Sequence, residues 1–382
     1  MQSTSNSAAP ELSVKVFEGP EAVNGLAIAW DDLFNRVPDA PAYLSYPWIN
    51  CFFSTSQLRG EVLSITVWAL DKLVALLVIS VRRQFGVRIA SVIGTGMPSI
   101  LGVLRDARYP EGMGLIANAL HSYRLIDLLC IDDLLSCDVG TNDLLQAMES
   151  RGFCCKRIYR VVTHWIRLES SYEQYLMLTK SNKRRYQLKR EEKNLFDSGG
   201  AIEPFAGKEI TAETILRMAR IQNEGWQKEA GANLLSFPSH IEIVGQMARA
   251  GMARAWILTV NGDDAAFVLA FVTKKQFHYY YTGYKTIYQS LSPGKTLTGH
   301  VIRFACEAGF AILDFGHSDQ DYKRFWSTDK FGISRAAIGL GFVGRIACTI
   351  KYMTWRLYDI AFVRRIYRHL KLAYLKRVTA AR

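Results

Sequence analysis

The stretch ARAWILTVNGDDAAFVLAFVTKKQFHYYYTGYKTIYQSLSPGKTL (residues 253–297) combines three predicted strands with the start of a helix. Asn261-Gly262 separates the first two apolar runs and is the strongest short hairpin signal, because both residues tolerate positive φ. A second turn is predicted near Lys274-Lys275. After the third strand, Ser292 suits an N-cap and Pro293 suits the first helical position. The stretch therefore predicts an antiparallel meander that runs into a helix, a pattern typical of α/β proteins.

The start of this helix has features of a phosphate-binding site. Gly294 has no side chain to block a ligand, and Lys295 adds a positive charge. The first N–H groups of a helix lack intrahelical partners and carry the positive end of the dipole, so they attract phosphate. A well-capped surface helix is the alternative interpretation. A nucleotide-triphosphatase loop is disfavoured, since that motif needs a glycine where Gln289 stands.

The third strand, FHYYYTGY, is rich in aromatic residues. Because side chains alternate along a strand, Tyr279 and Tyr281 share one face, whereas His278 and Tyr280 share the other. Tyrosine hydroxyl groups that line a cleft can orient or protonate a substrate. Packing in the core is the alternative for each of these tyrosines.

A strand end with many titratable residues follows the helix. In DFGHSDQDYKRFW, Asp314 is predicted at the rim of a sheet, and either Asp314 or His317 suits proton abstraction from an amine. A solvated polar loop is the alternative. The titratable and aromatic residues that this segment brings together are Asp314, His317, Asp319, Asp321, Tyr322, Lys323 and Trp326.

Helical segments precede the meander. One long helix is predicted over residues 171–198, ended by Gly199-Gly200, and two more are predicted over residues 211–231 and 238–251. The run KSNKRRYQLKREEKNL (residues 180–195) carries seven basic residues, among them Arg184 and Arg185, against two glutamates. Such a run indicates a solvated helix face or contact with an anionic substrate.

The first half of the chain is a weaker copy of the second. Strands are predicted for EVLSITVWAL, KLVALLVISVRR, RIASVIGT, LIDLLCI and FCCKRIYRVVTHWIRLES, and helices for YPEGMGLIANALHS and TNDLLQAMESRG. We predict an α/β (α+β) fold of two tandem lobes, each a mostly antiparallel sheet flanked by helices, over residues 13–168 and 169–340. Residues 1–12 are predicted to be a disordered tail.

Composition favours a globular protein. The chain has 382 residues, of which 49% are hydrophobic and 21% are charged. The longest apolar run, LVALLVISV (residues 73–81), is too short to span a membrane, and the N-terminus lacks the features of a signal peptide. Seven scattered cysteines without a CxxC pair favour reduced thiols in the cytoplasm and disfavour a zinc site.

The net charge of +12 is concentrated at the C-terminus. Residues 345–382 hold ten Lys/Arg and one Asp, a net charge of +9, which leaves +3 for the remainder. Trp355, Tyr358, Phe362 and Ile366 recur there at helical spacing. A basic amphipathic helix over residues 341–382 is therefore predicted to lie on an anionic membrane surface or on a membrane-bound partner. Nucleic-acid binding and docking onto the protein's own body are the alternatives.

Several short motifs of the second half occur together in one family. They are Ala265-Ala266, Tyr279-Tyr280-Tyr281, Gly283-Tyr284, Ser292-Pro293-Gly294, Asp314-Phe315-Gly316 and Tyr322-Lys323 followed by Trp326. Through these motifs, residues 170–330 resemble the GNAT-superfamily acyltransferases that are grouped as CelD-type cellulose-biosynthesis proteins. Those proteins are relatives of the FemAB aminoacyltransferases. The motif SYPWINCFF resembles the family's N-terminal lobe more loosely. The chain departs from the family at Lys285, where Asp is usual, and at His317-Ser318-Asp319, where a glycine is expected.

The resemblance implies an acyl-CoA co-substrate such as acetyl-CoA, with no permanently bound cofactor and no metal. The pyrophosphate of CoA would lie against the first amides of the helix and the residues around them, Ser292, Gly294, Lys295 and Thr296. Acyl transfer would be direct, without a covalent enzyme intermediate, and its catalytic candidates are Asp314 or His317 as base, with Tyr281 and Tyr284 as orienting groups or proton donors. The candidates for contact with the acceptor are Lys323, Tyr322, Trp326, Arg184 and Arg185.

These features predict an acyltransferase that acts on an amine or hydroxyl of a small-molecule or saccharide acceptor. Polysaccharide or cell-envelope biosynthesis is the expected setting, in the cytoplasm or at the inner face of the membrane. Two other classes stay open. Transfer of an aminoacyl group from tRNA suits the basic run at residues 180–193. A non-catalytic binding protein of an envelope assembly suits the basic C-terminus.

Overall fold

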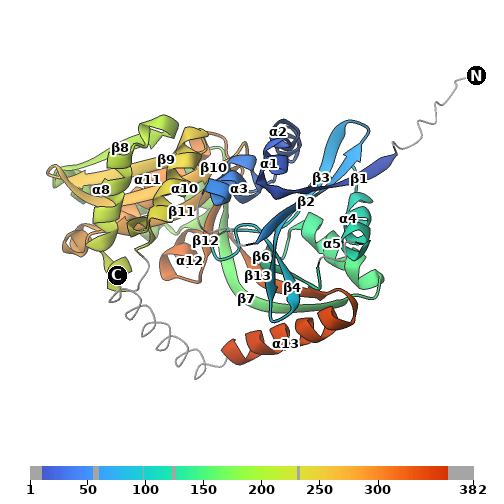
Figure 1. The fold of residues 1–382 in the computed structure, drawn as a ribbon. Coiled ribbons are helices and arrows are strands. Elements are labelled where there is room, and N and C mark those ends of the chain that lie inside the picture. The colour runs from blue at the N-terminus through green and yellow to red at the C-terminus, as the bar shows by residue number, and fades with distance from the viewer. Residues whose placement is uncertain (1–10, 55–59, 98, 123–125, 230–232, 360–382) are drawn as a thin grey trace, which may run out of the picture.

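The computed structural model describes residues 11–54, 60–97, 99–122, 126–229 and 233–359 (Figure 1). The strands of the first half are β1 (Leu12–Glu18), β2 (Glu61–Ala69), β3 (Lys72–Gln84), β4 (Val87–Val92), β5 (Leu104–Arg105), β6 (Leu128–Leu135) and β7 (Cys154–Arg167). Its helices are α1 (Gly19–Asn24), α2 (Ala27–Arg36), the 3-10 helix η1 (Ala42–Leu44), α3 (Tyr46–Ser54), α4 (Gly112–Ser122) and α5 (Val139–Ser150).

The second half begins with helices and ends with a helix. Its helices are α6 (Tyr172–Thr179), α7 (Asn182–Asp197), η2 (Gly207–Glu209), α8 (Ala212–Asn223), α9 (Trp226–Glu229), η3 (Leu234–Ser236), α10 (Pro238–Arg249), η4 (Thr286–Leu291), α11 (Pro293–Glu307), α12 (Asp321–Trp326) and α13 (Gly341–Asp359). Its strands are β8 (Gly200–Ala206), β9 (Ala253–Val260), β10 (Asp263–Val272), β11 (Gln276–Tyr284), β12 (Ile312–His317) and β13 (Asp329–Gly339).

All of these strands belong to one mixed sheet, which confirms the predicted α/β class. The strand order is β1-β2-β3-β4-β6-β13-β7-β12-β11-β10-β9-β8, with β5 paired to β3. Neighbouring strands are antiparallel except β4–β6 and β11–β12, which are parallel. Each half therefore contains an antiparallel meander that ends in one parallel pair.

Helices cover both faces of the sheet, and alternate residues of β10 show how. Phe267, Leu269 and Phe271 pack in one core cluster with residues of α8 and α10, whereas Val268 and Ala270 pack in another with residues of α11. The first cluster continues into the first half of the chain, where Trp48 of α3 contacts Phe271. The two halves thus share a hydrophobic core as well as a sheet.

The predicted meander is confirmed as β9, β10 and β11. Asn261 (φ 50°) and Gly262 (φ 83°) form the tight turn between the first two strands, as their sequence predicts. The predicted helix after Ser292 is α11, and it begins at Pro293. Local turn chemistry accounts for both results, because these residues set the backbone conformation without help from the rest of the fold.

Other elements differ from the prediction. The long helix expected over residues 171–198 is two helices, because the Ser181 side chain accepts the N–H of Arg184 and starts α7 anew. The strands β8 and β13 were not predicted. β13 lies between β6 and β7 of the first half, and β7 separates it from β12, the strand that precedes it in sequence.

The parallel pair β11–β12 opens part-way along its length. Residues 276–278 pair with residues 312–314, and β12 then bulges between Asp314 and His317. Residues 279–284 of β11 therefore lack β12 as a neighbour in the sheet. A divergent pair of this kind leaves room for a ligand between the strands.

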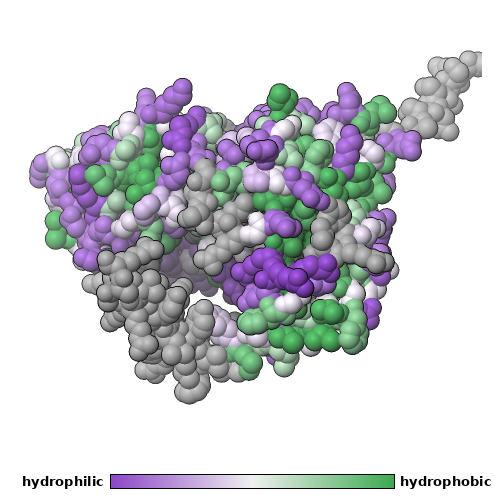
Figure 2. All heavy atoms as spheres, viewed as in Figure 1, coloured by the Kyte–Doolittle hydropathy of each residue, from purple (hydrophilic) through white to green (hydrophobic). Residues whose placement is uncertain are grey.

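The last described helix, α13, packs against β13 and β7. Cys348 and Trp355 are buried on its inner side, and Figure 2 shows apolar side chains along its outer side at the lower edge of the molecule. The remainder of the predicted amphipathic segment, residues 360–382 with Phe362 and Ile366, lies outside the described residues, as do residues 1–10 of the predicted tail. Among the described residues, no helix is both long and apolar enough to cross a membrane.

Candidate active site

Two adjoining cavities lie where β11 and β12 diverge. The small cavity has a volume of about 200 Å³ and the large cavity a volume of about 600 Å³. Both are lined by the same group of side chains, which forms their shared wall: Gln227, Tyr279, Thr282, Gln320 and Tyr322. Ligands in the two cavities would therefore meet at this wall.

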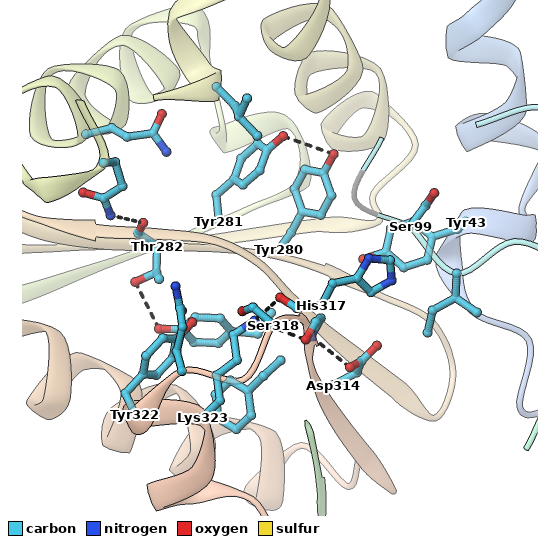
Figure 3. Close-up of a pocket in the computed structure, with 18 residues that line it drawn as sticks. Tyr43, Ser99, Tyr280, Tyr281, Thr282, Asp314, His317, Ser318, Tyr322 and Lys323 are labelled. Carbon is cyan, nitrogen blue, oxygen red and sulfur yellow. Dashed lines mark hydrogen bonds between the residues drawn. The ribbon is translucent and has the colours of Figure 1, made fainter. Parts of the chain in front are cut away.

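The small cavity lies between the two halves of the chain (Figure 3). Tyr43 and Ser99 come from the first half, and they face the end of β12 and the start of α12. The predicted residues that the structure brings together here are Tyr281, Asp314, His317, Tyr322 and Lys323. Tyr284, Ser292, Gly294, Lys295 and Trp326 line the large cavity instead.

Asp314 is 2% exposed and lies at the bulge of β12. Its carboxylate accepts hydrogen bonds from the Thr163 hydroxyl and from the Gly316 N–H, and the His278 Nδ1 lies 3.6 Å away. Burial alone would raise the pKa of Asp314, but the nearby His278 and these hydrogen bonds outweigh it, so the pKa is lowered. Asp314 thus stays ionised and holds the turn at Gly316 in place, which suits a positioning role.

His317 has the properties of a neutral base. Burial lowers the pKa of His317 to about 4, so the ring is neutral near pH 7. Its Nε2 is buried and has no hydrogen-bond partner in the part of the chain that the structure describes. Its Nδ1 lies 3.7 Å from the carboxylate of Asp133, a residue of β6 that the sequence did not single out. A neutral imidazole in a cavity wall can take a proton from an amine or hydroxyl group of a bound substrate.

Lys323 places a positive charge at the other side of the same turn. Its Nζ donates hydrogen bonds to the carbonyl oxygens of Gly316 (3.1 Å) and His317 (2.8 Å). Burial lowers the pKa of Lys323 to about 8, while the charge of Asp314 opposes this shift. The ammonium group is therefore mostly charged near pH 7 and close to losing its proton in mild base.

The two predicted tyrosines of β11 serve different cavities. The Tyr281 hydroxyl lies in the small cavity, 2.6 Å from the His240 Nδ1, and burial raises the pKa of Tyr281 well above its usual range. Burial lowers the pKa of His240, so the ring is neutral and shares a hydrogen bond with the Tyr281 hydroxyl. The ring of Tyr284 lines the large cavity beside Gly294, where a Cβ on residue 294 would approach Tyr284 to 3.2 Å.

The start of α11 differs in detail from the predicted phosphate site. Ser292 has φ 54° and its hydroxyl makes no capping hydrogen bond. Its carbonyl oxygen accepts the N–H groups of both Lys295 and Thr296 at 3.1 Å. Of the three amides expected to hold a phosphate, two are therefore already bonded, and the Gly294 N–H is the remaining one. Thr296 is buried and does not line the large cavity.

Three cations surround the ring of Phe325, and we call them the Phe325 cation cluster; Phe325 and Lys295 line the large cavity. The distances from the ring centroid are 5.0 Å for Lys180 Nζ, 5.4 Å for Lys295 Nζ and 5.8 Å for Arg184 Cζ. Burial lowers the pKa of Lys180 to about 8. Lys295 is also paired with Glu191 at 2.8 Å. This grouping supplies the positive charge that the amides alone do not.

The other residues expected to contact an acceptor have different surroundings. Trp326 is 1% exposed and borders the large cavity. Arg185 donates to the Lys180 carbonyl and to the Asn182 side chain, and neither cavity is lined by it. Tyr322 belongs to the shared wall, and burial raises its pKa well above the usual range.

Sequence reasoning missed several residues of the site. Gln227 donates from Nε2 to the Thr282 carbonyl at 2.7 Å, and its buried Oε1 has no partner among the described residues. His240 and Gln227 occur singly on helices, so no spacing pattern marked them. Lys180 belongs to the basic run that the sequence did indicate, but its position beside Phe325 depends on the packing of α6 against α12.

A family model matches part of the second half of the chain. Residues 182–324 match the family model described as an acetyltransferase (GNAT) domain. That range contains the meander, α11, β12 and the start of α12. No curated protein matches the chain by sequence.

Solved structures show the same fold at low sequence identity. A crystal structure of FemX has a TM-score of 0.59 and 11% identity, over 80% of this chain and 95% of that one. The C-terminal domain of a putative lysylphosphatidylglycerol synthetase from Agrobacterium fabrum has a TM-score of 0.53 and 12% identity, over 85% and 94% of the two chains. These likenesses concern the fold of both halves together.

Proposed function

We propose that this protein is an acyltransferase that moves an acyl group from a CoA thioester to an amine or hydroxyl acceptor. The match of residues 182–324 to the GNAT acetyltransferase domain supports the reaction class. The observation that carries the proposal is the pair of cavities with a shared wall, because a ternary complex needs two ligands whose reacting atoms meet.

The large cavity is assigned to the donor. A CoA pyrophosphate is anionic, and the Phe325 cation cluster with the Gly294 N–H supplies charge and a free donor at one end of this cavity. Lys295 exchanges its pairing with Glu191 for the phosphate in this scheme. The thioester then reaches the shared wall, where the buried Gln227 Oε1 can accept a hydrogen bond from an amide of the pantetheine arm.

The small cavity is assigned to the acceptor and to the chemistry. The acceptor nitrogen or oxygen attacks the thioester carbonyl, the new C–N or C–O bond forms, and the C–S bond breaks. His317 Nε2 takes the proton that the acceptor loses, and Lys323 stabilises negative charge on the carbonyl oxygen. Tyr322, in the shared wall, gives a proton to the departing thiolate, a role that the sequence had offered to Tyr281 or Tyr284.

Tyr281 orients the acceptor in this scheme, with His240 holding its hydroxyl. The wall formed by Tyr43, Ser99 and Tyr280 brings aromatic and hydroxyl groups to the acceptor side. Such a lining suits a saccharide or another small polar molecule that carries an amine or hydroxyl. A setting in polysaccharide or cell-envelope biosynthesis, at or near a membrane, is part of the proposal.

Aminoacyl transfer from tRNA is the second candidate. The observation in its favour is the exposed basic side of α7 beside the large cavity, formed by Lys183, Arg184, Lys189, Arg190 and Lys193. Such a surface can contact an RNA backbone. The two candidates differ in the donor, so donor binding separates them. A non-catalytic binding protein, the third class, would release no CoA thiol with any acceptor.

The test is calorimetric titration of the full chain with acetyl-CoA, with longer acyl-CoAs and with aminoacyl-tRNA. We expect acyl-CoA binding that weakens at least about tenfold in Arg184→Glu, because the variant places a negative charge in the Phe325 cation cluster. The matched control is Arg220→Glu on α8, which changes charge equally away from both cavities. Absence of acyl-CoA binding by the unaltered protein would contradict the proposal, and binding of aminoacyl-tRNA alone would support the second candidate.

A further inference from the structure

The outer side of α13 is an exposed apolar stripe. Its members recur at spacings of three and four residues, which places them on one side of a helix. Their exposed fractions run from 49% for Ile346 to 79% for Phe342. The α13 stripe consists of Phe342, Val343, Ile346, Ile350, Met353 and Leu357.

Packing against the body does not explain this stripe. The opposite side of α13 carries the residues that the protein buries, namely Gly344, Cys348 and Trp355. These pack with Val87 and Ile89 of β4 and with residues of β6, β7 and β13. The helix is therefore anchored by one side, while a second apolar side faces outward over about four turns (Figure 2). A contiguous apolar surface of this kind marks an interaction site.

The charges around the stripe are almost all positive. In α13, Arg345, Lys351 and Arg356 are positively charged, and Asp359 at the end of the helix is negatively charged. The sequence that continues from this helix, residues 360–382, carries seven Lys/Arg and no Asp or Glu. The α13 stripe thus belongs to a helix with a net positive charge, and a strongly basic segment follows that helix in sequence.

A second apolar group lies beside the start of α13. Phe85, at the turn between β3 and β4, is 96% exposed, and its neighbours in sequence include Arg82, Arg83 and Arg88. Arg88 binds Asp127, whose carbonyl oxygen also accepts the N–H of Leu340 just before α13. The turn and the helix therefore present aromatic and basic side chains from neighbouring parts of the fold.

We propose that the α13 stripe, with Phe85 and the surrounding arginines, docks onto an anionic lipid bilayer. Apolar side chains enter the interface between headgroups and acyl chains, and the basic residues bind the anionic headgroups. Charge complementarity selects this occupant, because a symmetric contact with a second copy would bring the same cations together. The docking holds the enzyme at the membrane and does not depend on the acyltransferase assignment.

The test is flotation of the full-length protein with vesicles of phosphatidylcholine alone and with vesicles that also contain phosphatidylglycerol. We expect the protein to float with the anionic vesicles, and expect less to float as salt is raised. In Ile350→Glu/Met353→Glu the bound fraction falls at least about tenfold, because two charged groups replace apolar ones in the interface. Both positions are exposed, so the fold is retained.

The matched control is Ile28→Glu/Leu216→Glu, which makes the same chemical change at exposed positions of α2 and α8. This control is expected to float like the unaltered protein. Equal flotation of the stripe variant and the control, or no preference for anionic vesicles, overturns the proposal. So does a dimer in analytical ultracentrifugation that the stripe variant abolishes, since a second copy then covers the stripe.

Discussion

The β4–β6 and β11–β12 pairs are the two parallel pairs of the sheet, and the space beyond each pair is filled differently. In the first half, the chain that follows β4 stays bonded to the sheet beyond the β4–β6 pair. The Ile93 N–H donates to the Val78 carbonyl of β3, and the Leu101 N–H donates to the Asp133 carbonyl of β6. Ile93, Ile100 and Leu101 are buried there. Beyond the β11–β12 pair of the second half, the corresponding gap holds the two cavities.

The helices that follow the meanders repeat this contrast. α4 begins after Tyr109-Pro110-Glu111, and a Cβ on Gly112 would meet the side chains of Ala75 and Val67 at ordinary packing distance. α11 begins at Pro293-Gly294-Lys295, beside an open cavity and three cations. The described lining of the large cavity thus comes from the second half, whereas the first half adds Tyr43, Ser99 and Ile100 to the small cavity, so one architecture contributes differently in its two copies.

The largest expected effect comes from Lys323, the buried cation that binds the carbonyl oxygens of Gly316 and His317 in the small cavity. In Lys323→Met, kcat for CoA-thiol release is expected to fall by about 10²- to 10⁴-fold, because the carbonyl oxygen loses its cation. Release is measured with a thiol reagent. The control Lys156→Met, exposed on β7, should keep full activity.

Acyl-CoA binding by Lys323→Met, followed by calorimetry, separates lost chemistry from lost structure. Normal binding with lost turnover is the expected pair of results. Normal turnover would move the chemistry away from the turn at Gly316 and remove the proposed contrast between the halves.

A second substitution compares the two helix starts directly. Gly294→Glu puts bulk against Tyr284 and a negative charge in the proposed phosphate site, so the Kd for acetyl-CoA is expected to rise at least about 100-fold. Gly114→Glu places the same residue in the first turn of α4, beside Arg151, and is expected to leave the Kd unchanged. Calorimetry measures both. An equal loss in the two variants would mean that the halves contribute alike to donor binding.

The sequence predicted those parts of the fold that local chemistry determines. Asn261-Gly262 specifies its turn, Pro293 specifies the start of α11, and the alternating apolar runs specify the meander. β13 could not be predicted in the same way. Its place between β6 and β7 depends on partners almost 200 residues away, and its own residues, DKFGISRAAIG, carry little strand pattern.

The same limit applies to the site. The sequence indicated the segment from Asp314 to Trp326 and the start of α11, and the structure places both at the cavities. It did not indicate that Asp314 accepts hydrogen bonds from Thr163 and Gly316 or that Glu191 pairs with Lys295. Those properties arise from contacts across the fold, and they decide which titratable group is free to react.

The smallest expected effect is a pH dependence of kcat, which we assign to the titration of groups in the second half of the chain. The pKa of Lys323 is lowered to about 8 by burial, so its cation is lost as pH rises through that value. We expect kcat to fall about tenfold per pH unit above pH 8 if the cation is required. The pKa of His317 is lowered to about 4, so the neutral base is present throughout the range from pH 5 to 8.

The titration of Lys180 has to be distinguished from that of Lys323, because burial lowers the pKa of Lys180 to about 8 as well. Lys180 lies at the donor phosphates in the proposed scheme, so its titration should raise the KM for acyl-CoA and leave kcat unchanged. Arginine keeps its charge far above pH 8, so Lys323→Arg should remove the fall in kcat and Lys180→Arg should remove the rise in KM. If kcat of Lys323→Arg still falls above pH 8, a group other than Lys323 causes the fall. His317 would then be the catalytic group that remains at the turn at Gly316.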